Sequence, residues 1–179
     1  MIRFHGWLIP ALVIVGADLG SGLTAAAQVK LDDAQILASL DRACAHEVEH
    51  ATLAVERGSV PEVKALAQRI RDAYTAASGE GRELAERLRI SLVSRGPSAV
   101  ADSHHAMISD MNNMKGTDFD RAYVEHEIGD HQALLDHVTK TLLPGASNPE
   151  LKALLERLGP MIKSHIDEAK ALKQQLNKA

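Results

Sequence analysis

The sequence of 179 residues has few aromatic side chains, a single cysteine and no excess of positive charge. Aromatic residues make up 3% of the chain, and Cys44 cannot form an intramolecular disulfide. Cys44 falls on the apolar stripe of a predicted helix, which indicates a small buried side chain. Lys and Arg number 20 against 24 Asp and Glu, a net charge of -4. Because the chain lacks the cationic surface that nucleic acids attract, no nucleic acid is expected as a partner.

A hydrophobic content of 45% is nonetheless ample for a core. The apolar residues are mainly Ala, Leu, Val and Ile, and Ala and Leu are strong helix formers. No segment alternates apolar and polar residues in the manner of a strand. The length suits one domain. The sequence therefore predicts a single all-α domain.

The first 27 residues have the pattern of an export signal. "MIRFHG" carries an arginine and no acid, "WLIPALVIVGA" is a short apolar run, and "TAAAQ" supplies an Ala-x-Ala site before Gln28. This order is typical of a secretory signal peptide, and the apolar run is short for a bilayer span. We predict a signal peptide at 1–27 and a bundle domain at 28–179. That domain would be periplasmic or secreted, with no stable membrane span after cleavage; an uncleaved N-terminal anchor is the alternative.

Four long segments show the three- and four-residue apolar spacing of amphipathic helices. The first runs from about Asp32 to Arg57 and stops at Gly58. The second begins at Ser59, where Glu62 would complete a capping box around an early proline.

The third helix is predicted to start near Thr117 or Asp118 and to end before Pro144, and the fourth to start at the N-cap Asn148. Residues 91–120 form a long connection with room for one or two helical turns. Two long helices, a long crossover and two more long helices predict a ferritin-like four-helix bundle.

Acidic and histidine residues fall on the apolar stripes of three of these helices. They are Glu47 on the first, Glu127 and His131 on the third and His165 on the fourth. Because a carboxylate or imidazole is costly to bury alone, we expect these four side chains to lie together. Two interpretations remain open: a metal site with oxygen and nitrogen ligands for Zn, Mn or Fe, or a structural network that fixes helix register.

The other charged groups of "EHEIGDHQALLDH" at 125–137 are expected to lie away from this cluster. Asp130 and Asp136 should face water, and His126 and His137 should point elsewhere than His131 if the helix is regular. The adjacent histidines at 104 and 105 are interpreted as surface side chains that could also chelate a metal.

The chain resembles a bacterial family called domain of unknown function 4142, a ferritin-like and exported family. The matching segments are "EVEHATLAVERGSVPEVKALAQRIRDA" at 47–73, "KGTDFDRAYVEHEIGDHQALL" at 115–135 and "LGPMIKSHIDEAKAL" at 158–172. The resemblance implies four inward polar positions, of which Glu47, His131 and His165 match three. On the second helix the family tends to carry Asp-His, whereas this chain has Asp72-Ala73, so Ala73 would face the cluster without a ligand.

The resemblance brings no settled activity, and a standard di-iron set of two Glu-x-x-His motifs is absent. The first hypothesis is therefore an exported bundle without a complete catalytic set, which binds a small ligand or an envelope partner in envelope maintenance or stress tolerance. The alternative is a metal-binding or oxidoreductase bundle that uses the inward Glu and His cluster.

The predicted cleavage site gives a direct test of export. Exported protein should begin near Gln28, because "TAAAQ" carries the best small-residue site. Intact-mass measurement of periplasmic material checks this. A full-length mass together with retention in the membrane fraction would instead support the uncleaved anchor.

Overall fold

The structure, a computed structural model, describes residues 31–92 and 107–178. Its elements are all helical, as the sequence predicts: α1, α2, α4, η1, α5 and α6. The four long helices are α1 (Asp33–Arg57), α2 (Pro61–Arg87), α4 (Gly116–His137) and α6 (Pro149–Leu176). Residues 107–112 form a further helical segment. The predicted signal peptide and the histidine pair at 104 and 105 lie outside the described residues.

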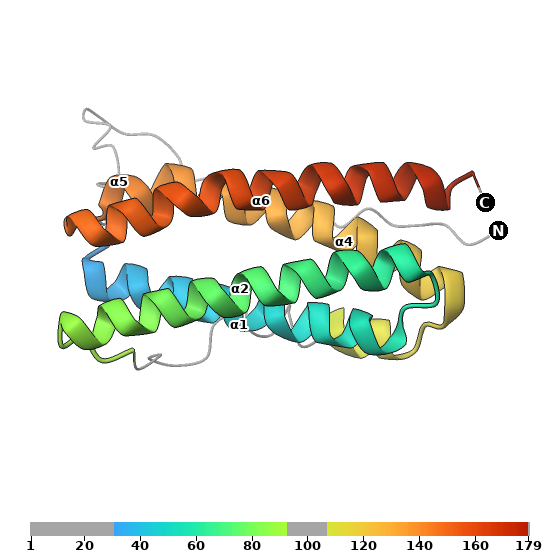
Figure 1. Ribbon diagram of the computed structural model, residues 1–179, viewed down its shortest axis with the longest axis horizontal. Coiled ribbons are helices and arrows are strands. Elements are labelled where there is room, and N and C mark those ends of the chain that lie inside the picture. The colour runs from blue at the N-terminus through green and yellow to red at the C-terminus, as the bar shows by residue number, and fades with distance from the viewer. Residues whose placement is uncertain (1–30, 93–106, 179) are drawn as a thin grey trace, which may run out of the picture.

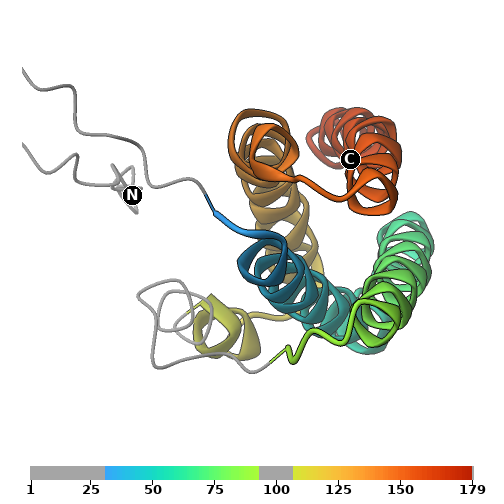
Figure 2. The same ribbon diagram turned by 90° about the vertical axis from the view of Figure 1, so that its left-hand side faces the viewer.

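The four long helices lie side by side and form a bundle (Figure 1). Seen end-on, they stand at the corners of a four-sided cross-section, while residues 107–112 lie outside it beside α1 (Figure 2). Contacts join α1 to α2, α2 to α6, α6 to α4 and α4 to α1. Every long helix therefore has two neighbours and directs one face into a shared core.

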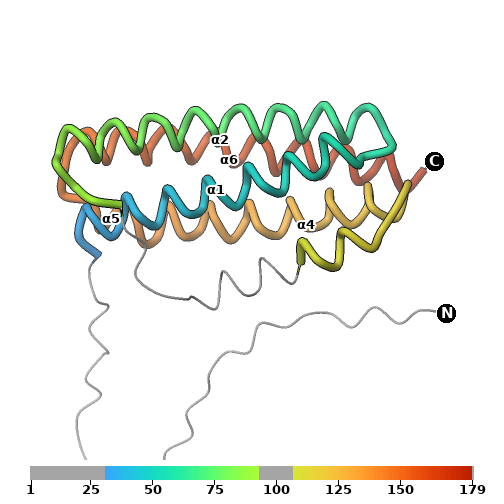
Figure 3. The backbone as a smooth tube through the Cα atoms, turned by 90° about the horizontal axis from the view of Figure 1, so that it is seen from below, coloured from blue at the N-terminus to red at the C-terminus, as the bar shows by residue number. Residues whose placement is uncertain are grey.

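The helix directions match the predicted long crossover. α1 and α2 run in opposite directions, as do α4 and α6, whereas α2 and α4 run in the same direction (Figure 3). The connection from Leu88 to Lys115 therefore has to return the chain from one end of the bundle to the other. Assignment to the ferritin-like class stays a prediction.

The first helix begins and ends where the sequence indicates. Asp32 is the N-cap, and its side chain and that of Gln35 each accept a hydrogen bond from the other's backbone N–H, at 2.7 and 3.0 Å. Gly58 is the C-cap, with an ordinary negative φ of -52°. A Cβ at Gly58 would lie 2.8 Å from the carbonyl oxygen of Ala54. Lack of space, rather than a left-handed backbone, is what favours glycine here.

The predicted capping box of the second helix does not form. The N-cap is Val60, without a side-chain cap, and the Ser59 hydroxyl donates to Asp120 of α4. The carboxylate of Asp120 also accepts the backbone N–H groups of Ser59 at 2.9 Å and Val60 at 3.0 Å. A buried acid from a distant helix thus replaces the local cap, because its position satisfies several donors of the α1–α2 turn at once.

The third helical run extends further than predicted. After α4, the chain continues through the π-helical turn η1 (Val138–Leu142) and the short α5 (Leu143–Gly145), so helical structure passes Pro144. α2 likewise continues without interruption through the glycines at 79 and 81. α6 begins as predicted, with Asn148 accepting N–H bonds from Glu150 and Leu151.

The core contains the predicted apolar stripes. Leu158 and Ile162 of α6 are buried, as are the stripe residues of α1, Leu37, Leu40, Cys44, Glu47, Ala51 and Ala54. Small side chains on α1 let its backbone approach the neighbouring helices closely. In the described part of the chain, no helix combines the length and apolar character that a membrane crossing requires.

The role of Asp120 gives a stability test. Asp120→Ala should lower the free energy of unfolding by about 2–3 kcal/mol, because Ser59 and Val60 lose a charged acceptor in a buried setting. Urea denaturation measures the effect. The exposed Asp118→Ala, two residues earlier on the same helix, is the matched control and should change stability by less than about 0.5 kcal/mol. Equal effects of the two variants would contradict the role given to Asp120.

Candidate metal centre

The first helix supplies Glu47 and His50 to the interior. They are three residues apart and therefore share one face of α1, flanked by the buried Cys44 and Ala51. Both side chains are almost completely buried. Their neighbours along the stripe, Cys44 and Ala51, are small, so α4 can approach α1 at the position of the two polar groups.

The third long helix, α4, supplies two acid–histidine pairs with i, i+4 spacing. Glu127 and His131 form one pair and are fully buried; His126 and Asp130 form the other and are partly exposed. The pairs are offset by one residue, which turns their faces apart by about 100° on a regular helix. One pair consequently points into the bundle, and the other lies at its edge.

Glu47, His50, Glu127 and His131 meet between α1 and α4, and we call them the inner cluster. Ligand atoms of Glu47, His50 and Glu127 all lie within 4.8 Å of one another. His131 Nδ1 is 3.1 Å from Glu127 Oε2 and 3.7 Å from Glu47 Oε2. Two carboxylates and two imidazoles thus share one buried space.

No lysine or arginine neutralises this cluster, since the buried polar residues of the described chain are only acids and histidines. Burial raises the pKa of Glu47 to about 8, opposed by His131 and reinforced by Glu127. Burial likewise raises the pKa of Glu127 to about 8, opposed by His126. The site therefore favours a bound proton, or another positive charge, over two free carboxylates.

Several atoms of the inner cluster are buried without a well-formed hydrogen bond. Among the described residues they include both carboxylate oxygens of Glu127, Oε2 of Glu47 and both ring nitrogens of His131. His131 Nδ1 and Glu127 Oε2 approach each other closely but without hydrogen-bond geometry. Such atoms are costly to bury and are free to bind a ligand.

A second group, which we call the outer triad, comprises His50, His126 and Asp130. Their ligand atoms also lie within 4.8 Å of one another. His126 Nε2 is 2.9 Å from Asp130 Oδ2, and the rings of His50 and His126 meet edge to face at 4.8 Å. Burial opposes ionisation of His126 and Asp130, but their close pairing outweighs it: the pKa of His126 is raised and that of Asp130 is lowered.

Tyr74 is the residue of α2 that faces the cluster, so the expectation for Ala73 was wrong. Ala73 is only half-buried, whereas the ring of Tyr74 lies 5.5 Å from that of His131 and 5.9 Å from that of His165. The apolar stripe advances four residues from Ile70, not three. Burial, reinforced by Glu47, raises the pKa of Tyr74 well above its usual value.

His165 of α6 lies beside His131, with ring centroids 5.3 Å apart. It belongs to neither group of ligand atoms found within 4.8 Å among the described residues. Burial, with a smaller contribution from His131, lowers the pKa of His165 to about 4. His165 is therefore a neutral neighbour of the inner cluster at neutral pH.

The structure thus brings together three of the four predicted site residues directly and places the fourth next to them. His50 was missed as a member of the site, although it follows Glu47 by three residues. As expected, the Asp130 side chain is partly exposed and His126 points away from His131, but the sequence did not indicate that both lie beside His50. The signal in the sequence was the i, i+4 spacing of His126 and Asp130, but only the position of α1 shows that they meet His50.

Other polar groups singled out in the sequence have local roles. Asp136 pairs with Lys140 at 2.9 Å on the surface. His137 lies 3.3 Å from the Ser39 hydroxyl of α1, and burial lowers its pKa. Cys44 is a buried free thiol whose pKa burial raises to about 12, which makes it an unreactive core residue.

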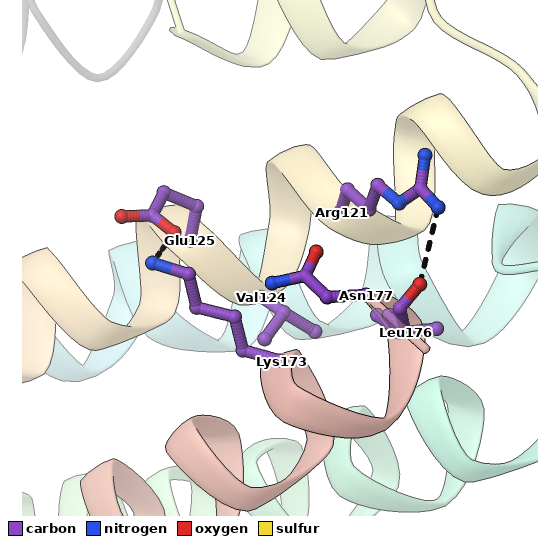
Figure 4. A pocket seen from close by; sticks show the side chains of 6 residues that line it. All are labelled: Arg121, Val124, Glu125, Lys173, Leu176 and Asn177. Carbon is purple, nitrogen blue, oxygen red and sulfur yellow. Dashed lines mark hydrogen bonds and ion pairs between the residues drawn. The ribbon is translucent and has the colours of Figure 1, made fainter. Parts of the chain in front are cut away.

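Two surface hollows lie away from the cluster. One, of about 50 Å³, lies between α4 and α6 (Figure 4). Within it Lys173 pairs with Glu125, and Arg121 donates to the Leu176 carbonyl oxygen at 3.1 Å. The other, of about 270 Å³, lies between α2 and α6, where Glu80 pairs with Arg157 and Arg87 with Glu150. Both are below the usual ligand-pocket range of about 300–1,000 Å³, and most of their charged side chains are held by neighbouring groups.

The raised carboxyl pKa values predict how the metal-free protein responds to pH. The folded pKa of Glu47 and Glu127 is about 8 against an ordinary 4.5, so their contribution to stability is complete below pH 4.5 and is lost as pH rises through 8. The low pKa of His165 acts oppositely, but only between about 4 and 6.5. Stability should therefore fall from pH 6.5 to 8.

Urea denaturation in the presence of a chelator at pH 6.5 and 8 measures this fall. Glu47→Gln removes one titrating group and should make the fall smaller, whereas Asp136→Asn on the surface should leave it unchanged. Stability that is constant or rises across this interval in the unsubstituted protein would contradict the assignment.

Comparison with solved structures finds the same helical fold in three proteins. A DUF305 fragment from Deinococcus radiodurans has a TM-score of 0.71 and 14% identity, over 80% of this chain and 95% of that one. CopM in its Cu(II)-bound form has a TM-score of 0.65 and 16% identity, over 81% and 98%. A DUF305 protein from Streptomyces coelicolor, described as secreted, has a TM-score of 0.69 and 15% identity, over 81% and 93%.

At these identities the likeness concerns the fold alone. Among curated proteins, no relative matches the chain. The sequence profile of the family described as Domain of unknown function (DUF4142) matches residues 20–172. The match spans almost all of the helical domain, including α1, α2, α4 and most of α6. The chain belongs to the DUF4142 family.

Proposed function

We propose that this chain is an exported metal-binding protein that holds one divalent transition-metal ion in the inner cluster. The observation that carries the proposal is the meeting of Glu47, His50 and Glu127, all buried, with ligand atoms within 4.8 Å of one another. His131 adjoins the same carboxylates. Export rests on the N-terminal pattern and on the resemblance to a family of exported proteins.

Charge balance favours an ion at this position. Two ionised carboxylates in a dry interior repel each other, and the described core offers no lysine or arginine to compensate. One divalent cation would neutralise both. Because the carboxyl pKa values are about 8, the metal-free site holds protons at neutral pH, which an incoming cation has to displace.

The ligand atoms of the inner cluster restrict which metal ions it can bind. Two carboxylate oxygens and two imidazole nitrogens suit Zn, Mn, Fe or Cu(II), and such a set binds Cu(II) and Zn more tightly than Mn. The alkaline-earth ions prefer all-oxygen sites. CopM, which has a similar fold, is known in a Cu(II)-bound form, and this supports adding copper to the ions expected from the sequence.

In this proposal the chain's own residues bind and orient the ion. Glu47 and Glu127 supply charge, while His50 and His131 supply neutral nitrogen ligands from opposite sides of the α1–α4 contact. The Tyr74 ring packs on His131 from α2 and limits access of water from that side. The proposal assigns binding and no catalysis, because no nucleophile or complete acid–base set joins these residues in the described structure.

Titration with metal ions tests the proposal. Protein purified without an affinity tag should bind one Cu(II) or Zn(II) per chain in calorimetric titration, and Mn(II) or Fe(II) more weakly. Glu127→Gln and His131→Ala should each weaken binding by roughly ten- to a hundredfold, the usual cost of disturbing a metal site. His137→Ala, a half-buried histidine on the same helix, is the control and should bind normally.

His165→Ala distinguishes two candidate ligand sets. The set expected from the sequence includes His165, and the inner cluster does not. Binding with near-normal affinity is expected, because His165 contacts His131 and lies outside the ligand group. The structural-network interpretation gives another result: no metal dependence, with His131→Ala lowering stability by about 1–3 kcal/mol. That outcome would overturn the proposed function.

A further inference from the structure

The outer triad connects the inner cluster with the protein surface. Exposure of the side chains increases stepwise along it: Glu127 and His50 are each 1% exposed, His126 is 24% exposed and Asp130 is 45% exposed. All the steps lie on α1 and α4, which also supply the inner cluster. An aqueous ion can therefore contact Asp130 without any helix moving, whereas Nε2 of His126, which lies 2.9 Å from Asp130 Oδ2, and the carboxyl group of Glu127 are covered by protein.

His50 belongs to both groups. Its ligand atoms lie within 4.8 Å of those of Glu47 and Glu127 on one side and of His126 and Asp130 on the other. His50 Nδ1 is 4.0 Å from Asp130 Oδ2. A neutral imidazole has one free lone pair and therefore ligates one ion at a time. Binding through His50 at the outer triad and at the inner cluster is consequently sequential and not simultaneous.

The chemistry of the outer triad suits a first contact with a cation. The carboxylate of Asp130 attracts positive charge from solution, and the imidazoles of His126 and His50 offer nitrogen ligands that replace hydration water. Three ligands with two exposed members make a weaker site than four buried ones. An ion held there is thus able to leave for the inner cluster.

We propose that the outer triad is the uptake site through which a divalent transition-metal ion reaches the inner cluster, with His50 passing the ion from one group to the other. The inference rests on the proposed function of the inner cluster and adds a route to it. The ligand class at the outer triad is the same: Cu(II), Zn(II) or a related ion with affinity for imidazole.

Binding kinetics test this route. Cu(II) uptake by the metal-free protein is followed in a stopped-flow instrument by quenching of intrinsic fluorescence, to which Tyr74, packed on His131, contributes. Asp130→Asn and His126→Gln, which preserve side-chain size, should each slow association by about tenfold, within the range that electrostatic attraction contributes to association rates. Glu127→Gln should instead weaken equilibrium binding.

The equilibrium constant is the decisive second measurement. A residue that acts only on the route changes association and dissociation by the same factor, so Kd in the Asp130→Asn and His126→Gln proteins should stay within about threefold of the unsubstituted value, a difference of ~0.6 kcal/mol. Asp136→Asn and His137→Ala, on the same helix, should leave both the rates and Kd unchanged. Melting curves confirm that each variant is folded.

The results distinguish failure of the route from failure of the site. Unchanged association rates in folded Asp130→Asn and His126→Gln proteins would overturn the uptake role while leaving the inner cluster intact. A weakened Kd with normal association would make these residues part of the binding site itself and would also overturn it. Absence of Cu(II) and Zn(II) binding in the unsubstituted protein would overturn the proposed function and the inference together.

Discussion

Two carboxyl groups lie buried between α1 and α4, with no buried lysine or arginine among the described residues, and they are the constraint around which this bundle is built. Glu47 and Glu127 cannot both be ionised in a dry interior unless positive charge joins them. Histidines are the groups that the sequence provides for this purpose, and His50 and His131 lie against the acids. Burial therefore keeps protons on these carboxyl groups at neutral pH, and under the proposed function a metal ion would take their place.

Position along the helices matters as much as residue type. Asp120, Glu127 and His131 recur at seven and four residues and therefore lie along one face of α4. Asp120 binds the turn between α1 and α2, and this contact fixes the register of α4 against α1. With that register set, Glu127 lies opposite Glu47. At the other end of α1, Asp33 accepts N–H bonds from Ser147 and Asn148, which joins α1 to the start of α6.

The arrangement also explains how one helix can carry both a buried and an accessible group. The offset of one residue between the two acid–histidine pairs of α4 directs Glu127 and His131 inward and His126 and Asp130 towards the edge. His50 of α1 lies where these two faces meet. The exposure of the side chains therefore decreases over a few residues of α4. This gradient follows from helix geometry together with the position of α1 alongside α4.

The family match and the solved structures support the helical fold. They do not identify which residues of this chain bind a ligand. Proteins with 14–16% identity share the bundle, and one of them is known in a Cu(II)-bound form. Their likeness gives no ligand positions in this chain. The evidence for the candidate site is consequently its own geometry, and chiefly the meeting of two buried acids, Glu47 and Glu127.

The sequence by itself determined the four long helices, their apolar stripes and the caps at Gly58 and Asn148, because helix periodicity and capping are local properties. It also indicated Glu47, Glu127, His131 and His165 as inward groups. Only the tertiary structure decided that Tyr74 replaces Ala73 at the cluster, that Asp120 caps the second helix and that Asp130 and His126 meet His50. Each of these depends on the rotation and register of one helix against another, and those are set by packing between residues far apart in the chain.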